Sequence, residues 1–169
     1  MRSLALALLL AGCGLSDEDI ARNLKSPNPV VREDTAKIAK NYGSDAVNKS
    51  LIAALDDPSP VVRKNAVDSL ASLEAKEAAP RLAELLGSET DPDTLREIVD
   101  ALGRLQDPNT APALIDWLTA RESDPPLNAI WALGNIGDPR SLELLSRLRN
   151  SSDPIVAYNA TAALRLLHP

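Results

Sequence analysis

The sequence predicts an all-α protein, an α-α superhelix built from stacked helix pairs. Three observations support this fold class. The 169-residue chain has no Phe, two Trp and two Tyr, so the aromatic residues that favour strands are scarce, whereas Leu and Ala, which favour helices, are abundant. A pattern recurs along the chain with a period of roughly 31 residues. Within each repeat, the apolar residues are spaced to form one face of a helix.

The repeat is visible in two series of apolar residues. The first helices contain a series with nearly constant spacing: Ala39, Leu70, Leu102, Leu133 and Leu164. The second helices contain a series that keeps the same spacing: Leu51, Leu82, Leu114 and Leu145. Two helices per repeat in a constant register indicate a solenoid, because stacked neighbours bury the apolar faces that a lone helix pair would leave exposed.

Each repeat begins with a turn signal that contains proline, at residues 26–29, 57–60, 91–93, 124–126 and 153–154. Proline is tolerated in the first turn of a helix but not in its interior, and Asp or Ser can cap the helix that follows. In the second repeat, the first helix carries one apolar stripe: Val62, Ala66, Val67, Leu70 and Leu73. The second helices carry leucine pairs: Leu51 and Leu55, Leu82 and Leu86, Leu114 and Leu118, Leu145 and Leu148.

We therefore expect about ten helices in about five repeats, the first near residues 17–25 and the last near 155–167. At the start of the first helix, Ser16 is followed three residues later by Asp19, which predicts a capping box.

The first thirteen residues have the parts of a secretory signal. Arg2 precedes an apolar run, and small residues precede Cys13, the only cysteine. The run is shorter than the roughly 20 residues of a membrane-spanning helix. The alternative is that residues 3–11 form a buried helix that caps the domain, with Cys13 as an ordinary small apolar residue.

The letters "LAGC" at residues 10–13 resemble the lipobox of bacterial lipoproteins. The resemblance implies that residues 1–12 are cleaved and that Cys13 becomes lipidated. Residues 13–16 would then be a short tether ahead of a repeat domain at 17–169. It also implies a location in the cell envelope, anchored by lipid, and Gly14 after the cysteine resembles the signal for the outer membrane in diderm bacteria.

The segments "DPSPVVRKNAVDSLASL" at 57–73 and "AIWALGNIGDPRSLELL" at 129–145 resemble the HEAT repeat family, specifically the short bacterial repeats of phycobilin lyases. Val62 and Arg63 match the Val-Arg pair of that family, from which the later repeats depart. The resemblance covers roughly residues 18–168 and implies a HEAT-like α-solenoid.

The composition indicates neither nucleic-acid binding nor a catalytic or metal site. A formal charge of −6 and a pI near 4.8, without a basic patch, argue against nucleic acid as a partner. The only His is His168, next to the C-terminus, and no Cys or His pairs have metal-ligand spacing. We therefore expect no metal and no cofactor, and we predict that the protein is not an enzyme.

Two tryptophans occupy special positions. Trp131 aligns with Asp68 and Asp100 of earlier repeats, so it is either a binding residue or packs against the neighbouring repeat, as Trp before "ALG" does in the resembled family. Trp117 aligns with Leu85 and Leu148 and is predicted to lie in the core.

The other candidate binding residues are polar positions of the second helices and apolar positions of the last helix. Glu84, Asp116 and Arg147 have mixed charges, which fits either a solvated face or a groove for a polar peptide. Tyr158 and Leu166 lie on a face of the last helix that no further helix covers, and exposed apolar patches often mark contacts.

Two functions follow. The first is a membrane-anchored, non-enzymatic scaffold or adaptor that binds a protein of unknown identity in the bacterial cell envelope, as a monomer or with weak self-association through the C-terminal helix. The alternative is a phycobilin-lyase-like repeat protein that assists the attachment of a chromophore or cofactor.

Overall fold

The computed structural model describes residues 14–167, and this part of the chain contains ten α-helices and no strand. The predicted fold class, an all-α HEAT-like solenoid of about ten helices, is confirmed. The chain divides into two compact units, an N-terminal unit that ends at Ala78 and a C-terminal unit that begins at Ala79.

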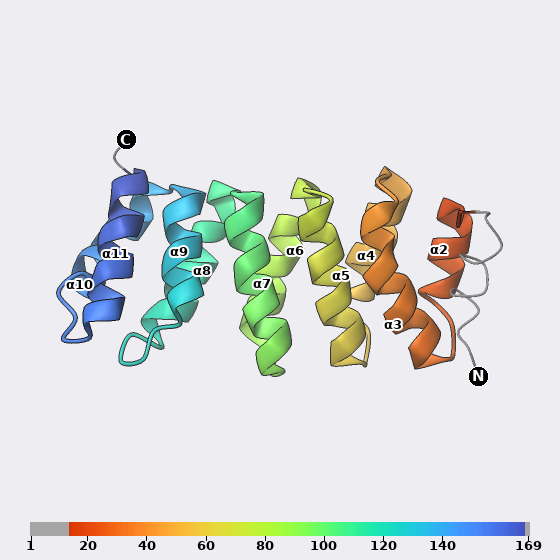
Figure 1. Ribbon diagram of the computed structural model, residues 1–169, viewed down its shortest axis with the longest axis horizontal. Helices are drawn as coiled ribbons and strands as arrows, with labels where there is room; N and C mark the ends of the chain where they lie inside the picture. Colours follow the sequence, from red (N-terminus) through yellow and green to blue (C-terminus); the bar gives the residue numbers. More distant parts are fainter. Residues whose placement is uncertain (1–13, 168–169) are drawn as a thin grey trace. The chain divides into compact units, whose positions relative to one another are not determined.

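The N-terminal unit holds four α-helices and two short 3₁₀ turns, η1 (Ala39–Asn41) and η2 (Lys76–Ala78). The helices are α2 (Asp17–Asn23), α3 (Pro29–Ile38), α4 (Asp45–Ala54) and α5 (Pro60–Ser72). Helix α3 lies beside α5, and α4 packs on α5 and α2 (Figure 1). The predicted capping box at α2 is present, because Ser16 Oγ accepts from Asp19 N and Asp19 accepts from Ser16 N.

The C-terminal unit holds six α-helices and two 3₁₀ turns, η3 (Pro108–Thr110) and η4 (Pro139–Ser141). The helices are α6 (Ala79–Ser88), α7 (Pro92–Leu105), α8 (Ala111–Thr119), α9 (Leu127–Ile136), α10 (Leu142–Leu148) and α11 (Pro154–Leu167). The first helices of successive repeats, α7, α9 and α11, lie side by side, with α9 between the other two (Figure 1).

Proline sets where the first helices begin. Pro29, Pro60, Pro92 and Pro154 each occupy the first position of a helix. The fourth repeat differs because Pro126 follows Pro125: a residue before proline is disfavoured in the α conformation, so α9 begins only at Leu127 and is shorter than α7.

The core consists of the predicted apolar stripes. All eight leucines of the second-helix pairs are buried, and so are four of the five residues of the α5 stripe, with only Leu73 half-exposed. Because the apolar residues of each helix face its stacking neighbours, the repeat pattern itself determines which side chains are buried.

Two glycines allow the first helices of the C-terminal unit to approach closely. A Cβ at Gly103 of α7 would lie 2.8 Å from the Cα of Ala132 in α9, and one at Gly134 of α9 would lie 2.9 Å from the Cα of Ala163 in α11. The same contact therefore recurs one repeat later, which holds α7, α9 and α11 at a similar separation.

Candidate functional site

A hollow of the C-terminal unit lies where the first half of α7, the end of α8 and the start of α9 meet. It has a volume of about 580 Å³, and we call it the Trp117 groove. Its walls are formed by ten residues: Pro92, Asp93, Leu95, Arg96, Val99, Trp117, Arg121, Pro126, Leu127 and Asn128. The lining is mainly apolar, with two arginines and one carboxylate.

Trp117 is half-buried, which corrects our prediction that it belongs to the core. Its equivalents Leu85 and Leu148 are buried, but an indole is larger than a leucine side chain, and at the end of α8 part of it forms the groove wall. The guanidinium of Arg121 lies over the ring, with Cζ 4.0 Å from the ring centroid, and its Nη1 donates to the Trp117 carbonyl oxygen at 2.9 Å. Arg121 is thus fixed as a cation above an aromatic face.

Only some of the polar groups around the groove form hydrogen bonds or ion pairs within the described part of the chain. The Trp117 Nε1 is buried and donates to no acceptor among residues 14–167, and such an orphaned donor ordinarily costs about 1–3 kcal/mol. The guanidinium groups of Arg96 and Arg121 form no ion pair with any carboxylate in the described part of the chain, whereas Asn128 donates from Nδ2 to Asp100 Oδ1 at 3.0 Å. The groove therefore offers donors and positive charge.

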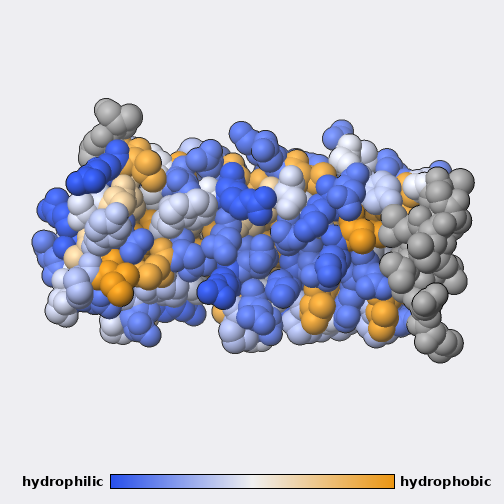
Figure 2. All heavy atoms as spheres, in the orientation of Figure 1, coloured by the Kyte–Doolittle hydropathy of each residue, from blue (hydrophilic) through white to orange (hydrophobic). Residues whose placement is uncertain are grey.

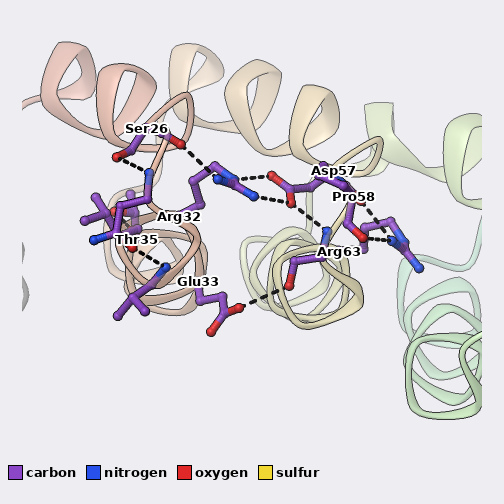
Figure 3. Close-up of polar contacts among 11 residues, drawn as sticks. Ser26, Arg32, Glu33, Thr35, Asp57, Pro58 and Arg63 are labelled. Atoms are coloured by element: carbon purple, nitrogen blue, oxygen red, sulfur yellow. Dashed lines mark hydrogen bonds and ion pairs between the residues drawn. The ribbon is translucent and has the colours of Figure 1, made fainter.

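In the N-terminal unit, the repeat position that Leu95 occupies in α7 holds an arginine, namely Arg32 in α3 and Arg63 in α5. Arg32 of α3 donates from Nε and Nη2 to the two carboxylate oxygens of Asp57, at 2.6 and 3.0 Å, and from Nη1 to the Ser26 carbonyl oxygen at 2.9 Å (Figure 3). One repeat later, Arg63 donates to the carbonyl oxygens of Asp57 and Pro58 (Figure 3). Arg32 thus ties two successive loops together, whereas Arg63 holds the loop that precedes its own helix.

The Arg32–Asp57 pair is almost fully enclosed, with side chains 12% and 7% exposed. Burial would raise the pKa of Asp57, but the hydrogen bonds from Arg32 and from the Ser59 N–H, with the charges of Arg32 and Arg63, outweigh it and hold the pKa below its usual value. A smaller hollow of about 420 Å³ lies beside this pair, with Lys25, Asp56 and Asp57 in its lining.

In α7, the position that corresponds to Arg32 two repeats earlier holds Leu95, which lines the Trp117 groove. An apolar side chain thus replaces the guanidinium that would tie two loops together. At the end of α8, Trp117 likewise stands two repeats after the small residue Ala54 of α4. These two exchanges give the groove its apolar wall and its aromatic side. The departure from the Val-Arg pair and the tryptophan among leucines are visible in the sequence, but neither predicts that these residues line a groove.

Trp131 is 45% exposed, and it also packs on the neighbouring repeat, because its ring Cζ3 would lie 2.9 Å from a Cβ at Gly103. It lines a separate shallow hollow of about 400 Å³ with four polar residues: Glu97, Asp100, Arg104 and Asn128. Both roles considered from the sequence are therefore compatible with its position, and a role in binding stays a prediction.

The three polar candidates are exposed and do not line either groove. Glu84 accepts from Arg81 at 2.8 Å, and Arg147 donates to Glu122 at 2.9 and 3.1 Å and to Glu143 at 3.0 Å, whereas Asp116 lies exposed on α8. Local ion pairs of opposite sign leave no extended charge here for a ligand to recognise.

The last helix presents an apolar face. Tyr158 and Leu166 are 74% and 52% exposed, and Ile155 is 58% exposed, and Figure 2 shows hydrophobic groups gathered over α11. Val156 and Ala160 on the opposite side are buried. Exposed apolar patches often mark contacts with other molecules.

Cys13 and His168 lie outside the described residues. Within residues 14–167, no helix combines the length and the apolar composition needed to cross a bilayer, and no three His, Cys, Asp or Glu side chains gather closely enough to hold a metal ion.

Residues 17–96 and 86–165 match the family of HEAT repeats, and the chain belongs to this family. A protein of Pseudanabaena tenuis (strain PCC 7409), named uncharacterized phycocyanin operon protein Z, is 29% identical over 160 residues, which covers 89% of this chain and 78% of that protein.

Among solved structures, a chain of the complex of CpcE and CpcF of phycocyanin lyase from Nostoc sp. PCC7120 is 26% identical, with a TM-score of 0.77. The match covers 93% of this chain and 66% of that one, so the present chain spans just under two thirds of its length. A designed armadillo repeat protein is 21% identical, with a TM-score of 0.59, and shares the fold. The match covers 96% of this chain and 85% of the designed chain.

The prediction that the protein is not an enzyme is wrong, because the similarity extends over nearly the whole chain to a component of a lyase complex and to a phycocyanin operon protein. The reasoning behind the prediction considered only nucleophiles and metal ligands. A repeat surface can also accelerate a reaction by binding and orienting the reactants, and this requires no histidine or cysteine.

Proposed function

We propose that this chain is a phycobilin-lyase-like HEAT repeat protein that assists the attachment of a phycobilin chromophore to a protein. The observation that carries the proposal is the match to the phycocyanin lyase complex over 93% of this chain. The relative named for the phycocyanin operon, 29% identical over 160 residues, supports a role connected with phycocyanin.

The available side chains indicate what such a protein would contribute. Residues 14–167 contain no Cys and no His. We infer that this part of the chain contributes binding and orientation, with arginines, lysines and carboxylates as its charged groups. Holding two reactants in a productive geometry is worth effective concentrations of about 10⁵–10⁸ M in well-oriented cases, which is sufficient to explain assistance without a nucleophile of its own.

The function is tested by the colour of the acceptor. Phycocyanin apo-subunits are expressed in bacteria that produce a phycobilin, with the full chain, without it, and with CpcE and CpcF as the positive control. After denaturing electrophoresis, only covalently attached chromophore stays with the acceptor. We expect more attached chromophore with the chain than without it; equal colour in the two samples would contradict the proposal.

HEAT repeats mediate protein interaction, and the Nostoc protein is a complex of two chains. We propose that the present chain also acts with a protein partner, or with a second copy, which covers the exposed face of α11. Leu166→Glu places a charge in this face at a half-exposed position. It is expected to abolish association measured by sedimentation while changing the unfolding midpoint little; unchanged association would contradict the role of this face.

The "LAGC" sequence supports a second proposal, that Cys13 anchors the chain to the cell envelope, at the outer membrane in a diderm host. Mass analysis of the N-terminal peptide of the full chain and of Cys13→Ser tests it. A lipidated peptide that begins at Cys13 and is lost in the variant is the expected result. An intact Met1 on unmodified protein would refute the anchor and support residues 3–11 as part of the folded chain.

A further inference from the structure

We propose that the Trp117 groove of the C-terminal unit binds the chromophore, an open-chain tetrapyrrole carboxylate; this inference rests on the proposed function. The groove of about 580 Å³ falls within the range of about 300–1,000 Å³ that is typical of small-molecule sites. It is built entirely from residues 92–128, so it belongs to one compact unit.

The apolar walls suit a flat conjugated ligand. Leu95 and Val99 of α7 and Leu127 of α9 line one side, and the indole of Trp117 adds an aromatic surface. Stacking on a flat conjugated ligand removes the apolar face of an aromatic ring from water. A tetrapyrrole presents a conjugated face along its whole length. Leu95 keeps this wall apolar. At the same repeat position in α3, Arg32 instead places a charged side chain that pairs with Asp57 of the next loop.

The charges suit a carboxylate. Arg121 is held over Trp117 by its hydrogen bond to the Trp117 carbonyl oxygen, and Arg96 also lines the groove. Neither guanidinium is paired with a carboxylate of residues 14–167, so each can donate hydrogen bonds to a propionate of the ligand. Asp93 is the single acidic residue of the lining, which leaves a net positive charge.

Fluorescence tests the groove directly, because the chain has only two tryptophans. In a Trp131→Phe background the full chain reports on Trp117 alone, and biliverdin is titrated as the probe. We expect saturable quenching, and biliverdin dimethyl ester, which lacks the carboxylates, should bind about tenfold more weakly or worse, because hydrogen bonds between charged groups are lost. No saturable quenching, or equal affinity for the ester, would overturn the proposal.

Two variants locate the site. Arg121→Ala and Trp117→Leu, the second restoring the residue of the neighbouring repeats, should each weaken biliverdin binding about tenfold, measured for both by the visible circular dichroism of the bound tetrapyrrole. Arg149→Ala, an exposed arginine outside the groove, is the matched control and should bind like the parent. Parental affinity in both groove variants would show that the tetrapyrrole binds elsewhere.

The failure of this inference can be told apart from failure of the proposed function. If Trp117→Leu supports chromophore attachment as well as the parent chain does, the groove is not the site although the function stands. If biliverdin binds in the groove and the chain adds no chromophore to the acceptor, the site stands and the proposed function is wrong.

Discussion

The contact between α7 and α9 gives a prediction in which two effects of opposite sign compete. A methyl group added at Gly103 would lie 2.8 Å from Ala132 Cα and 2.9 Å from both Ala132 Cβ and Trp131 Cζ3. Carbon atoms normally pack at about 3.5–4.0 Å, so the two helices would have to separate by most of an ångström. Overpacking of this kind costs about 1–3 kcal/mol.

The helix itself prefers alanine to glycine by up to about 1 kcal/mol. For Gly103→Ala we therefore expect a net loss of about 1–2 kcal/mol. Gly87→Ala is the matched control, because Gly87 lies in α6 and a Cβ there would meet nothing within 4 Å. The control retains the helical preference without the clash, so it should stabilise the protein by about 0.5 kcal/mol.

The assay is urea unfolding followed by circular dichroism. With a dependence on urea of about 2 kcal/mol per molar, Gly103→Ala should lower the midpoint by about 0.5–1 M, while Gly87→Ala should raise it slightly. A midpoint of Gly103→Ala equal to or above that of the parent would refute the close packing of α7 on α9. A loss of stability in both variants would refute the role assigned to the contact.

Two further predictions concern buried carboxylates. Asp57→Asn should cost about 2–4 kcal/mol at pH 7, because it removes the charge that pairs with Arg32. The pKa of Asp57 is lowered in the folded protein, so its contribution is complete above the unfolded value of about 3.9 and is lost as the pH falls through the folded value. The difference between the urea midpoints of parent and variant should therefore stay constant from pH 7 down to about pH 4 and shrink at lower pH, and a difference that does not shrink below about pH 4 would contradict the ion pair. Arg140 donates to the buried Asp138 and, at 2.9 Å, to the Pro108 carbonyl oxygen, and its hydrogen bonds are the main reason that the pKa of Asp138 is lowered. Arg140→Ala should lower the melting temperature by a few degrees in calorimetry, and Arg140→Lys should not restore it fully; a melting temperature like that of the parent would show that this link is not stabilising.

The helices and the core could be predicted because their signals are local and repeated. A helical stripe of apolar residues, a proline at a helix start and a leucine that recurs once in each repeat all constrain the same element, so the eight second-helix leucines were placed correctly. The capping box at Ser16 was found for the same reason, since its two partners are three residues apart.

The groove could not be predicted because it depends on what the repeats do differently. Aligning Trp117 with two buried leucines suggested a core residue, but the alignment does not say whether an indole fits into the space of a leucine. Leu95 is likewise an ordinary apolar residue until Arg32 is seen to bridge two loops at the equivalent position. The loss of an ion pair between loops is visible only when both repeats are compared in three dimensions.

The candidate site also shows why residue types alone misled the prediction of activity. The chain has one Cys and one His, both outside the described residues, so the residue types that usually react are scarce in it. A protein that binds and orients a ligand needs a shaped surface instead, and the Trp117 groove is lined mainly by apolar residues, a tryptophan and two arginines. Such residues are too common in repeat proteins to signal a site by their presence.

The measurement that tests the account most directly is the mass of a phycocyanin apo-subunit after incubation with phycobilin in the presence of the purified full chain, of the Trp117→Leu variant, or of neither. We predict that the subunit gains the mass of attached chromophore at a higher rate with the parent chain than with the variant or with no added protein. Equal rates in all three samples would contradict both the lyase-like function and the role of the groove.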